Sequence, residues 1–556
     1  MRKISAILLF FPVYVFGYAV STSSPYATRV AIDVLNEGGN AVDALVAASL
    51  VIGVANPYKM GIGGGGFFLV SNKGKTYFLN ARETAPNSAN EKMFLDSYGK
   101  PLAHIHQITG PRSVGIPGLV KGLAEVHRKF GRRPWKSLVA PSVEFAKRGV
   151  PISADFEKEL HYNWSRMDAY EESKKIFGDG YGSYLKAGRS LVQKDLSKFL
   201  EHLAKNPNLF YEGKIAKEWI SAAKKLGVQI EAKELEKYKT KVDKPIVFKV
   251  FGFDGVTAAA PSSSAFVVAG VLRYLEHYYS KKKDLWSADS VERVIVTTET
   301  SKLFQELRDK IVGDTPSESL QAYFSRDGRP TEKEKEVWKK IDQAITQKFQ
   351  EMKNPPKLAG PQPVNSDQQN SHTTHISIVD DKGMVVSSTL TIEAYFGSGM
   401  IVPGFGFLLN NELSDFDSIP GGPNTAKPGK RPRSNMSPII LQKSGKAVAV
   451  VGCAGGPRIP SAVAGILENF FIFKMNANEA MAFPRIHYGI HEGSSRLLIE
   501  KGYPPSTIKK LEELRYPVAR VDVMRSTAQA LLRNSPKQPW QAASESRYDG
   551  LAWATR

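Results

Sequence analysis

The feature that most restricts the fold of this chain is a sharp change of character at Thr373. The segment 355–372 is rich in Pro, Gln, Asn and Ser and poor in apolar residues, which is typical of an exposed, flexible loop. Directly after it, residues 373–379 alternate in polarity, Gly383 can turn the chain, and 384–392 has the pattern of a second strand. We therefore expect a β-hairpin whose first strand begins abruptly at the end of a loose loop.

The N-terminal part of the chain has the order helix, helix, glycines, strand. Apolar residues recur at helical spacing over 25–35, and Asn40 can cap a second helix over 41–55. Five glycines within 61–66 then precede a strand-like segment at 67–71. A phosphate-binding glycine loop needs the order strand, glycines, helix, so this order argues against a nucleotide site.

The remainder combines helices with short β segments and shows no internal repeat. Residues 119–353 are mainly amphipathic helix, with a β-rich interlude near 246–260. A further strand over 447–451 leads into a glycine pair before a helix that starts near Ser461. A length of 556 residues allows several domains or one large α/β unit, and it does not decide between them.

The composition indicates a globular protein with a basic surface. Hydrophobic residues make up 42% of the chain, which suits a large core rather than disorder, and the formal net charge is +20. Such a surface attracts nucleic acid, anionic lipid or acidic substrates. The basic residues are scattered through helical stretches such as 333–340, without a zinc-finger or RNA-binding pattern, so a solvated face is the simpler interpretation.

The first nineteen residues have the pattern of a secretory signal. Two basic residues precede an apolar run over 4–17, and Gly17 and Ala19 occupy the small-residue positions before a cleavage site. We therefore expect a signal peptide at 1–19 and export to the periplasm or beyond, with an uncleaved anchor as the alternative. Cys453 is the only cysteine, so the fold must rest on its core even in an oxidising compartment.

Eight short motifs occur in an order that resembles the γ-glutamyltransferase family over nearly the whole chain. The matching segments are EGGNAVDA (37–44), GIGGGGF (61–67), RETAP (82–86), GIPG (115–118), TTHISIVD (373–380), GFLLNNELSDF (406–416), KRPRSNMSP (430–438) and GGPRI (455–459). One such motif alone is a weak signal, and the ordered series is a strong one. The resemblance implies a four-layer αββα sandwich of the N-terminal-nucleophile hydrolase type.

The resemblance also implies a precursor that cuts itself before Thr373. The products would be a large chain of residues 20–372 and a small chain of residues 373–556, intertwined in one domain. The freed α-amine would serve as base for the Thr373 hydroxyl, which is a poor nucleophile without one. Thr391 matches a second threonine that positions the nucleophile, but the register of the hairpin cannot be derived from the sequence.

The implied activity is hydrolysis of glutathione and other γ-glutamyl amides, and transfer of the γ-glutamyl group to amino acids or peptides through an ester on threonine. The family match assigns the oxyanion hole to Gly455 and Gly456, the substrate α-carboxylate to Arg82 with help from Ser434, and the α-ammonium to Glu412 and Asp415. We also place Glu393, which stands where some family members have asparagine, and Asn435 in the substrate pocket. Asn435 and Arg433 depart from the family pattern of a second serine and an apolar residue. We expect no cofactor and no metal, because His104, His106, His372 and His375 lack ligand spacing.

Three alternatives remain open at this point. A related enzyme could cut or transfer poly-γ-glutamate, since the link from Asp415 to Lys430 is short and would leave a cleft open to γ-glutamyl oligomers. A related acylase could act on another side-chain amide. A protein of the same fold without activity could use its basic surface to bind polyanions.

Overall fold

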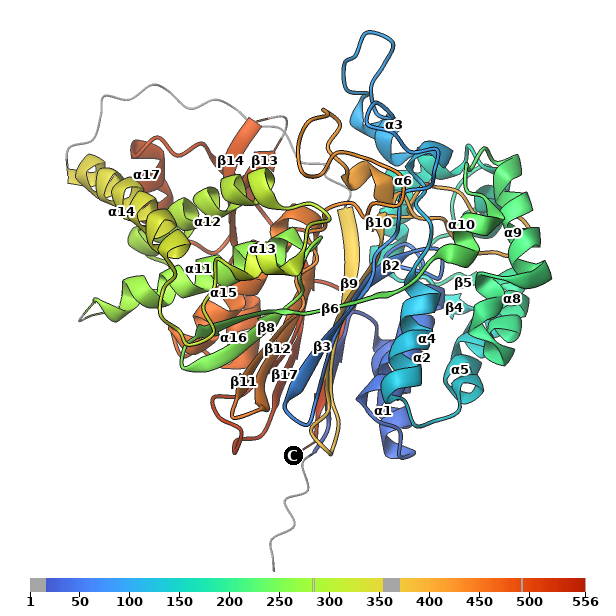
Figure 1. Cartoon of the computed structure of the whole chain (residues 1–556), viewed down its shortest axis with the longest axis horizontal. Coiled ribbons are helices and arrows are strands. Elements are labelled where there is room, and N and C mark those ends of the chain that lie inside the picture. Colours follow the sequence, from blue (N-terminus) through green and yellow to red (C-terminus); the bar gives the residue numbers. More distant parts are fainter. Residues whose placement is uncertain (1–16, 283, 285, 354–370, 492–493, 556) are drawn as a thin grey trace, which may run out of the picture.

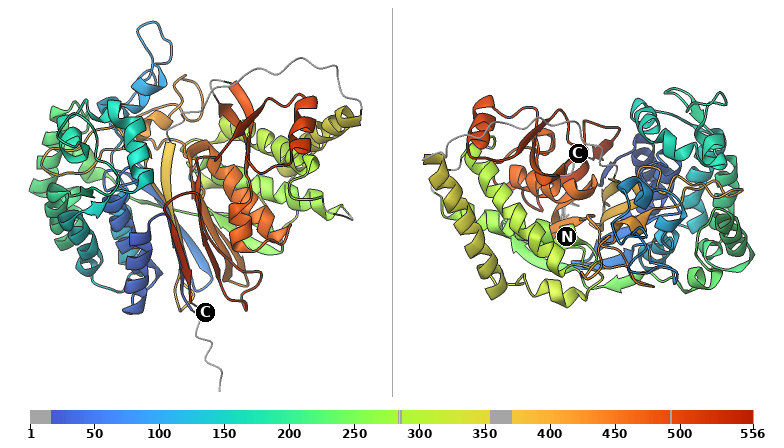
Figure 2. Two further views of the ribbon diagram at one scale, coloured as in Figure 1. Left: turned by 180° about the vertical axis from the view of Figure 1, so that it is seen from behind. Right: turned by 90° about the horizontal axis from the view of Figure 1, so that it is seen from above.

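The computed structural model describes residues 17–282, 284, 286–353, 371–491 and 494–555. Two antiparallel sheets lie face to face at the centre, and each outer face is covered by helices (Figure 1, Figure 2). The two sheets are in contact through β9, β10, β12 and β16. The predicted four-layer αββα sandwich is therefore confirmed.

The first sheet has seven strands and contains the segment that begins near Thr373. Its strands lie in the order β18 (Leu551–Ala554), β1 (Ala19–Thr22), β9 (Ser371–Val379), β10 (Val385–Ala394), β2 (Gly65–Asn72), β3 (Lys75–Ala81) and β6 (Lys241–Asp243). Strand β9 thus lies between the first strand of the described chain and its hairpin partner.

The second sheet has six strands. They lie in the order β17 (Gln541–Ser544), β16 (Thr527–Leu532), β12 (Lys446–Ala454), β11 (Ile439–Lys443), β8 (Phe253–Thr257) and β7 (Ile246–Val250). The short strands outside the sandwich are β13 (Ile486–His491), β14 (Ser494–Glu500), β15 (Val518–Val521), β4 (Val150–Pro151) and β5 (Ser190–Leu191).

In Figure 1, the helices that cover the seven-stranded sheet lie on the right, and those that cover the six-stranded sheet lie on the left. On the right are α1 (Pro25–Asn36), α2 (Ala41–Ala55), α3 (His104–Ile108), α4 (Leu119–Phe130), α5 (Trp135–Arg148), α6 (Ala154–Met167), α7 (Glu171–Phe177), α8 (Lys194–Lys205), α9 (Gly213–Lys225) and α10 (Ala232–Lys237). On the left are α11 (Ser263–Ser280), α12 (Val291–Ile311), α13 (Ser317–Gln321), α14 (Glu332–Lys353), α15 (Ile459–Phe471), α16 (Ala477–Ala482) and α17 (Pro505–Glu513).

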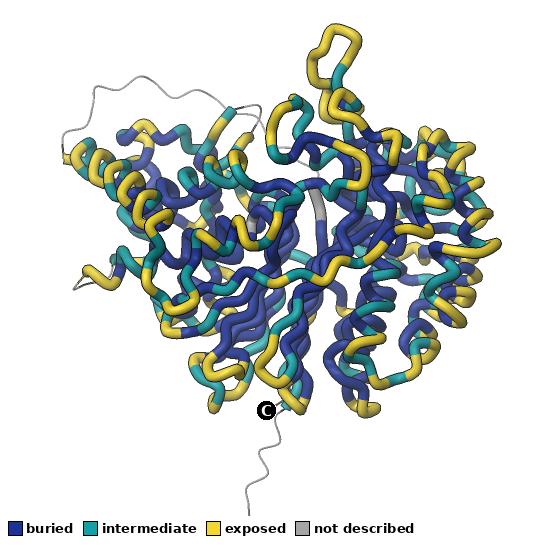
Figure 3. Tube along the Cα trace, viewed as in Figure 1, coloured by how far each residue is buried: buried dark blue, intermediate teal, exposed yellow. Residues whose placement is uncertain are grey.

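Helix α2 is buried along nearly its whole length. It packs against α1, α5, β9 and β10, and most of its side chains are fully buried (Figure 3). A helix that is apolar on every side suits this position. The side chain of Asn40 accepts hydrogen bonds from the backbone N–H groups of Val42 and Asp43, both at 3.0 Å, and its amide donates to the Phe130 carbonyl at 2.6 Å. The predicted cap thus also fixes a neighbouring helix.

The space between the sheets contains a polar cluster. The His375 ring bonds to the Thr389 hydroxyl at 2.8 Å, and the Ser377 hydroxyl donates to the Val450 carbonyl of the facing sheet at 3.2 Å. Burial lowers the pKa of His375 to about 3, so its ring is neutral. This hydrogen-bonded imidazole serves the packing of the two sheets, and it is not a free base.

The elements whose bounds were predicted from the sequence agree with the structure to within a few residues. The helices over 25–35 and 41–55 and the hairpin after Gly383 are confirmed. Strand β9 begins at Ser371, two residues before Thr373, because Ser371 still pairs with Ala394 of β10.

Three other expectations concern the loop, the last long helix and the N-terminus. The remainder of the predicted loop, 354–370, lies outside the described residues, as does 1–16 of the predicted signal. Helix α15 begins at Ile459 rather than near Ser461. No helix among the described residues is long and apolar enough to cross a membrane.

The Asn40 cap generates a stability prediction. We expect Asn40→Ala to lower the free energy of unfolding by about 2 kcal/mol, because the first N–H groups of helix α2 and the Phe130 carbonyl all lose their hydrogen-bond partner. Asn476 caps the short helix α16 in the same way but is exposed to water, so Asn476→Ala should cost about 0.5 kcal/mol. Urea unfolding of both variants measures the difference. Equal losses would contradict a special role for Asn40.

Candidate active site

Thr373 and Thr391 lie directly opposite each other in the β9–β10 hairpin. Opposite residues of an antiparallel pair project from the same face of the sheet, so the register that the sequence left open brings the two side chains together. Both residues are buried, with 3% and 2% exposure. The Thr391 hydroxyl also accepts a hydrogen bond from the backbone N–H of Glu393 at 2.8 Å.

Strand β1 holds the other side of β9. Its residues pair antiparallel with β9, from Thr22 opposite Ile376 to Ala19 opposite Val379. Just beyond the Thr22–Ile376 pair, the Ser23 hydroxyl is hydrogen-bonded to the hydroxyl of Thr374, the residue next to Thr373. The start of β9 is therefore fixed from both neighbouring strands.

The predicted glycine pair forms a tight turn beside β9. Strand β12 ends at Ala454, and the 3₁₀ turn Gly456–Arg458 that follows is in contact with β9. Gly455 has φ +132° and Gly456 has φ +55°, and a Cβ on Gly455 would lie 2.7 Å from the Arg525 carbonyl oxygen. Only glycine fits this backbone, which can bring N–H groups close to a reacting carbonyl.

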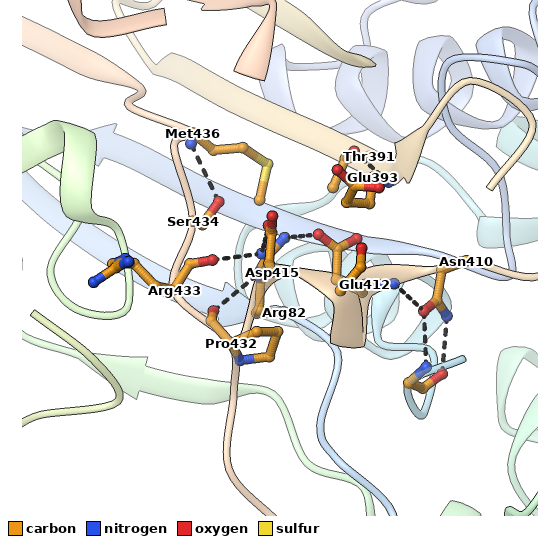
Figure 4. Close-up of polar contacts among 12 residues, drawn as sticks. Arg82, Thr391, Glu393, Asn410, Glu412, Asp415, Pro432, Arg433, Ser434 and Met436 are labelled. Carbon is orange, nitrogen blue, oxygen red and sulfur yellow. Dashed lines mark hydrogen bonds and ion pairs between the residues drawn. The ribbon is translucent and has the colours of Figure 1, made fainter. Parts of the chain in front are cut away.

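Arg82 is the centre of a buried ion cluster (Figure 4). It follows strand β3 and forms ion pairs with Glu412 and, at 2.5 Å, with Asp415, which both lie in the short 3₁₀ turn Glu412–Asp415. Its Nε and Nη2 also donate to the carbonyls of Pro432 at 3.2 Å and Arg433 at 2.9 Å. Residues that are hundreds of positions apart in sequence thus converge on Arg82.

The carboxylates of this cluster are hard to ionise. Burial raises the pKa of Glu412 to about 7, although the nearby Arg82 guanidinium opposes the shift. Burial also raises the pKa of Asp415, again against Arg82. Asp415 keeps 28% of its side chain exposed, so it forms the accessible side of the cluster. A ligand that carries its own positive charge would favour the ionised forms of both groups.

Glu393 joins the cluster from strand β10. It has φ +76° and is buried, and its carboxylate accepts a hydrogen bond from the Asn411 amide at 2.6 Å. Burial, with the charges of Asp415 and Glu412, raises its pKa well above the ordinary value. The positive charge of Arg166 in α6 partly opposes this rise, and burial lowers the pKa of that guanidinium to about 10. Sequence reasoning missed Arg166, since no motif marks it.

Ser434 and Asn435 lie along the segment that contacts Arg82. The Ser434 hydroxyl accepts a hydrogen bond from the Met436 N–H at 3.1 Å, and the Asn435 side-chain oxygen accepts one from Arg308 at 3.3 Å. The Arg433 side chain points away from Arg82 (Figure 4). Its guanidinium pairs with Asp417 at 2.8 Å. The unusual Arg433 therefore contributes its carbonyl to the cluster and its guanidinium elsewhere.

Glu83 is a second residue that sequence reasoning missed. It is fully buried. Among the described residues, no N–H or O–H group donates a hydrogen bond to either of its carboxyl oxygens. One oxygen of Glu412 is in the same situation. Burial and the charge of Glu412 raise the pKa of Glu83 well above its usual range. A protonated Glu83 can donate to Glu412, which accounts for both groups. Its place beside Arg82 in the RETAP motif was the available signal.

Neither the single cysteine nor a group of metal ligands adds a reactive centre among the described residues. Cys453 is buried, and burial raises the pKa of its thiol to about 12, so it is an unreactive core residue. Among the residues that the structure describes, no three His, Cys, Asp or Glu side chains are grouped as metal ligands.

Comparison with known proteins agrees with this geometry. A sequence model of the gamma-glutamyltranspeptidase family matches residues 27–555. The glutathione hydrolase proenzyme of Bacillus subtilis is 33% identical over 96% of this chain and 90% of its own length, and that of Escherichia coli is 34% identical over 93% and 89%. The crystal structure of a cephalosporin acylase from Bacillus halodurans has the same fold, with a TM-score of 0.80, 22% identity and 99% coverage of both chains. With the motifs and the converging site residues, these matches show that the chain belongs to the γ-glutamyltranspeptidase family.

Proposed function

We propose that the protein is a self-processing γ-glutamyltransferase whose nucleophile is the Thr373 hydroxyl. The observation that carries this proposal is the position of Thr373: at the start of a central strand, opposite Thr391 and after a loop-like segment. The hydroxyl attacks the carbonyl carbon of His372, the peptide C–N bond breaks, and the nitrogen takes the proton to become the α-amine of Thr373. Water then hydrolyses the ester and frees the two chains.

The same hydroxyl then attacks the γ-carbonyl carbon of a γ-glutamyl amide such as glutathione. The α-amine of Thr373 accepts the hydroxyl proton and returns it to the leaving amine, so that a γ-glutamyl ester remains on Thr373. Water or the amine of an amino acid or peptide resolves this ester. The backbone N–H groups of Gly455 and Gly456 stabilise the oxyanion of each tetrahedral intermediate.

The ion cluster around Arg82 is the proposed clamp for the α-amino acid end of the substrate. Arg82, with Ser434 and Asn435, binds the α-carboxylate, and Glu412, Asp415 and Glu393 bind the α-ammonium. In the structure Arg82 pairs directly with Glu412 and Asp415. A zwitterion can replace these contacts without changing the net charge of the buried site, because it brings one charge of each sign.

The strand order supports an intertwined pair of chains after cleavage. We propose that the mature, exported protein consists of residues 20–372 and 373–556. Strands β9 and β10 of the small chain lie between β1 and β2 of the large chain, and β18 pairs with β1. Hydrogen-bonded strands from both chains thus alternate within one sheet, which would keep the chains together without a covalent link.

A wider substrate range remains a proposal. The segment after Asp415 is compact, since Asn424 donates to the Asp415 carbonyl at 2.7 Å, and Ile419 within it is 69% exposed. No longer insertion is present between Asp415 and Lys430. We therefore expect room for γ-glutamyl oligomers as well as glutathione.

The nucleophile generates the first prediction on function. Thr373→Ala should abolish cleavage and turnover together, because one hydroxyl performs both reactions. Thr391→Ala should leave cleavage before residue 373 possible but slow both steps by about 10- to 1,000-fold, as for loss of a positioning hydrogen bond. Intact mass, N-terminal sequencing and release of a chromogenic γ-glutamyl anilide measure the effects. Normal processing of Thr373→Ala would identify another nucleophile.

The clamp generates the second prediction. Arg82→Ala or Asp415→Ala should raise the transition-state free energy by about 3–5 kcal/mol, because the first leaves the α-carboxylate of the bound substrate without its cation and the second leaves the α-ammonium without a carboxylate. Arg433→Ala is the matched control, since its guanidinium faces Asp417 and only its carbonyl contacts Arg82. We expect kcat/KM for glutathione to stay within about fivefold for this control. Wild-type kcat/KM in Arg82→Ala would remove the clamp from the mechanism.

Glu83 generates a prediction on pH dependence. A carboxyl whose folded pKa is raised binds its proton more tightly in the folded protein, so stability falls as pH rises from about 4.5 through the raised folded pKa. Glu83→Gln stays neutral and can still donate to Glu412. In the uncut Thr373→Ala background, the Gln variant should match the parent near pH 5 and become progressively more stable than it toward pH 9. Urea unfolding across this range measures the difference, and a difference that does not change with pH would refute a protonated Glu83.

A further inference from the structure

A cavity lies at the end of strand β9 that is opposite to Thr373. The turns of three hairpins meet there with the β16–β17 loop, around a volume of about 310 Å³. The seven residues from Thr373 to Val379 span roughly 20 Å, so this cavity is remote from the proposed nucleophile. Its charged and aromatic lining residues are Lys73, Lys382, Lys446, Arg533, Asp380 and Trp540.

The lining of this cavity is strongly cationic. Lys73 and Lys382 lie in exposed turns and Lys446 is exposed at the start of β12, while Arg533 is buried. Asp380 is the one carboxylate among the lining residues. Its oxygens accept hydrogen bonds from backbone N–H groups of Ala41, Lys382 and Met384, at 2.9 to 3.1 Å. Its charge is therefore directed at the backbone.

Arg533 has no carboxylate partner among the described residues, although it is only 7% exposed. Its guanidinium donates to the carbonyls of Ala447 at 2.6 and 2.9 Å and of Gln538 at 3.4 Å, and it stacks over the Trp540 ring at 4.1 Å. Burial lowers its pKa to about 10. A buried cation without a counter-charge is unfavourable, and these contacts leave N–H groups for a further acceptor.

We propose that this cavity binds a phosphomonoester group. Such a group carries a charge of about −1.5 to −2 near neutral pH and has three acceptor oxygens, which suits one guanidinium surrounded by three ammonium groups better than a single carboxylate does. The group could belong to a small soluble phosphate ester or to the headgroup of a lipid. Gly17, which also lines the cavity, belongs to the expected signal, and the other lining residues stay in the mature chains.

A bound phosphate would connect the two sheets. Lys73 and Lys382 are in turns of the seven-stranded sheet, whereas Arg533 and Lys446 belong to the six-stranded sheet. A ligand that contacts both sets binds the folded protein only, so it should raise the unfolding temperature as its concentration rises. Chloride at equal ionic strength should not, because it lacks the geometry to contact both sheets.

The test uses the mature two-chain protein and three matched forms: wild type, Lys73→Gln with Lys382→Gln, and Lys339→Gln with Lys340→Gln. The last pair removes the same charge from exposed positions on α14. Glycerol 3-phosphate binding is measured by calorimetry and by thermal unfolding. Sedimentation with vesicles of phosphatidylcholine, with or without phosphatidic acid, tests the lipid source. All three forms should hydrolyse the γ-glutamyl anilide normally, which shows that they are folded.

We expect saturable binding to wild type and about tenfold weaker binding to the cavity variant, with the α14 variant within about twofold of wild type. Binding of the soluble ester alone assigns a soluble ligand, and binding of phosphatidic acid vesicles alone assigns a lipid headgroup. The proposal is wrong if neither probe binds wild type at low salt. It is equally wrong if both double variants weaken binding to the same extent, because that result indicates diffuse surface attraction.

Discussion

The pairing of β9 with β1 and β10 is the constraint on which the rest of this structure depends. The strand that begins near Thr373 must be rigid enough to hold a hydroxyl in place, yet its first residues must follow a segment that can be cut. Two flanking strands and a hydrogen bond from Ser23 supply the rigidity, and the facing sheet contributes through Ser377. Since the flanking strands belong to distant parts of the chain, the proposed nucleophile is held in place only when these parts of the sandwich have come together.

The second requirement is a site that accommodates many charges out of water. Arg82 contacts Glu412 and Asp415, and Glu83 and Glu393 lie close enough to these carboxyls for their pKa values to rise. Buried charges are tolerated when they are paired and hydrogen-bonded, or when some of them bind protons. The cluster satisfies this rule with one guanidinium, backbone carbonyls and carboxyls that protonate readily. The same arrangement makes it responsive to a zwitterionic ligand, which supplies both signs at once.

The two ends of the central sheets have opposite electrostatic character. At the end where β9 begins, carboxyls outnumber the guanidinium that they surround. At the other end, Lys73, Lys382 and Arg533 face a cavity whose only lining carboxylate is directed at backbone N–H groups. The net charge of +20 is therefore not a uniform property of the surface, because these two ends differ in their local charge.

The sequence by itself determined the local elements, the order of the motifs and the family, because capping residues, hydrophobic periodicity and glycine turns are encoded over short stretches. Asn40 and its helix and the hairpin around Gly383 were predictable in this way, whereas the residues of the proposed Arg82 clamp were assigned only through the resemblance of the motifs to a known family. Only the tertiary structure decided which of them meet: that Thr391 lies opposite Thr373, that Arg433 turns away, and that Glu83 and Arg166 belong to the charged site. Register, burial and the pairing of charges depend on distant residues brought together by the two sheets, and no local pattern in the chain contains that information.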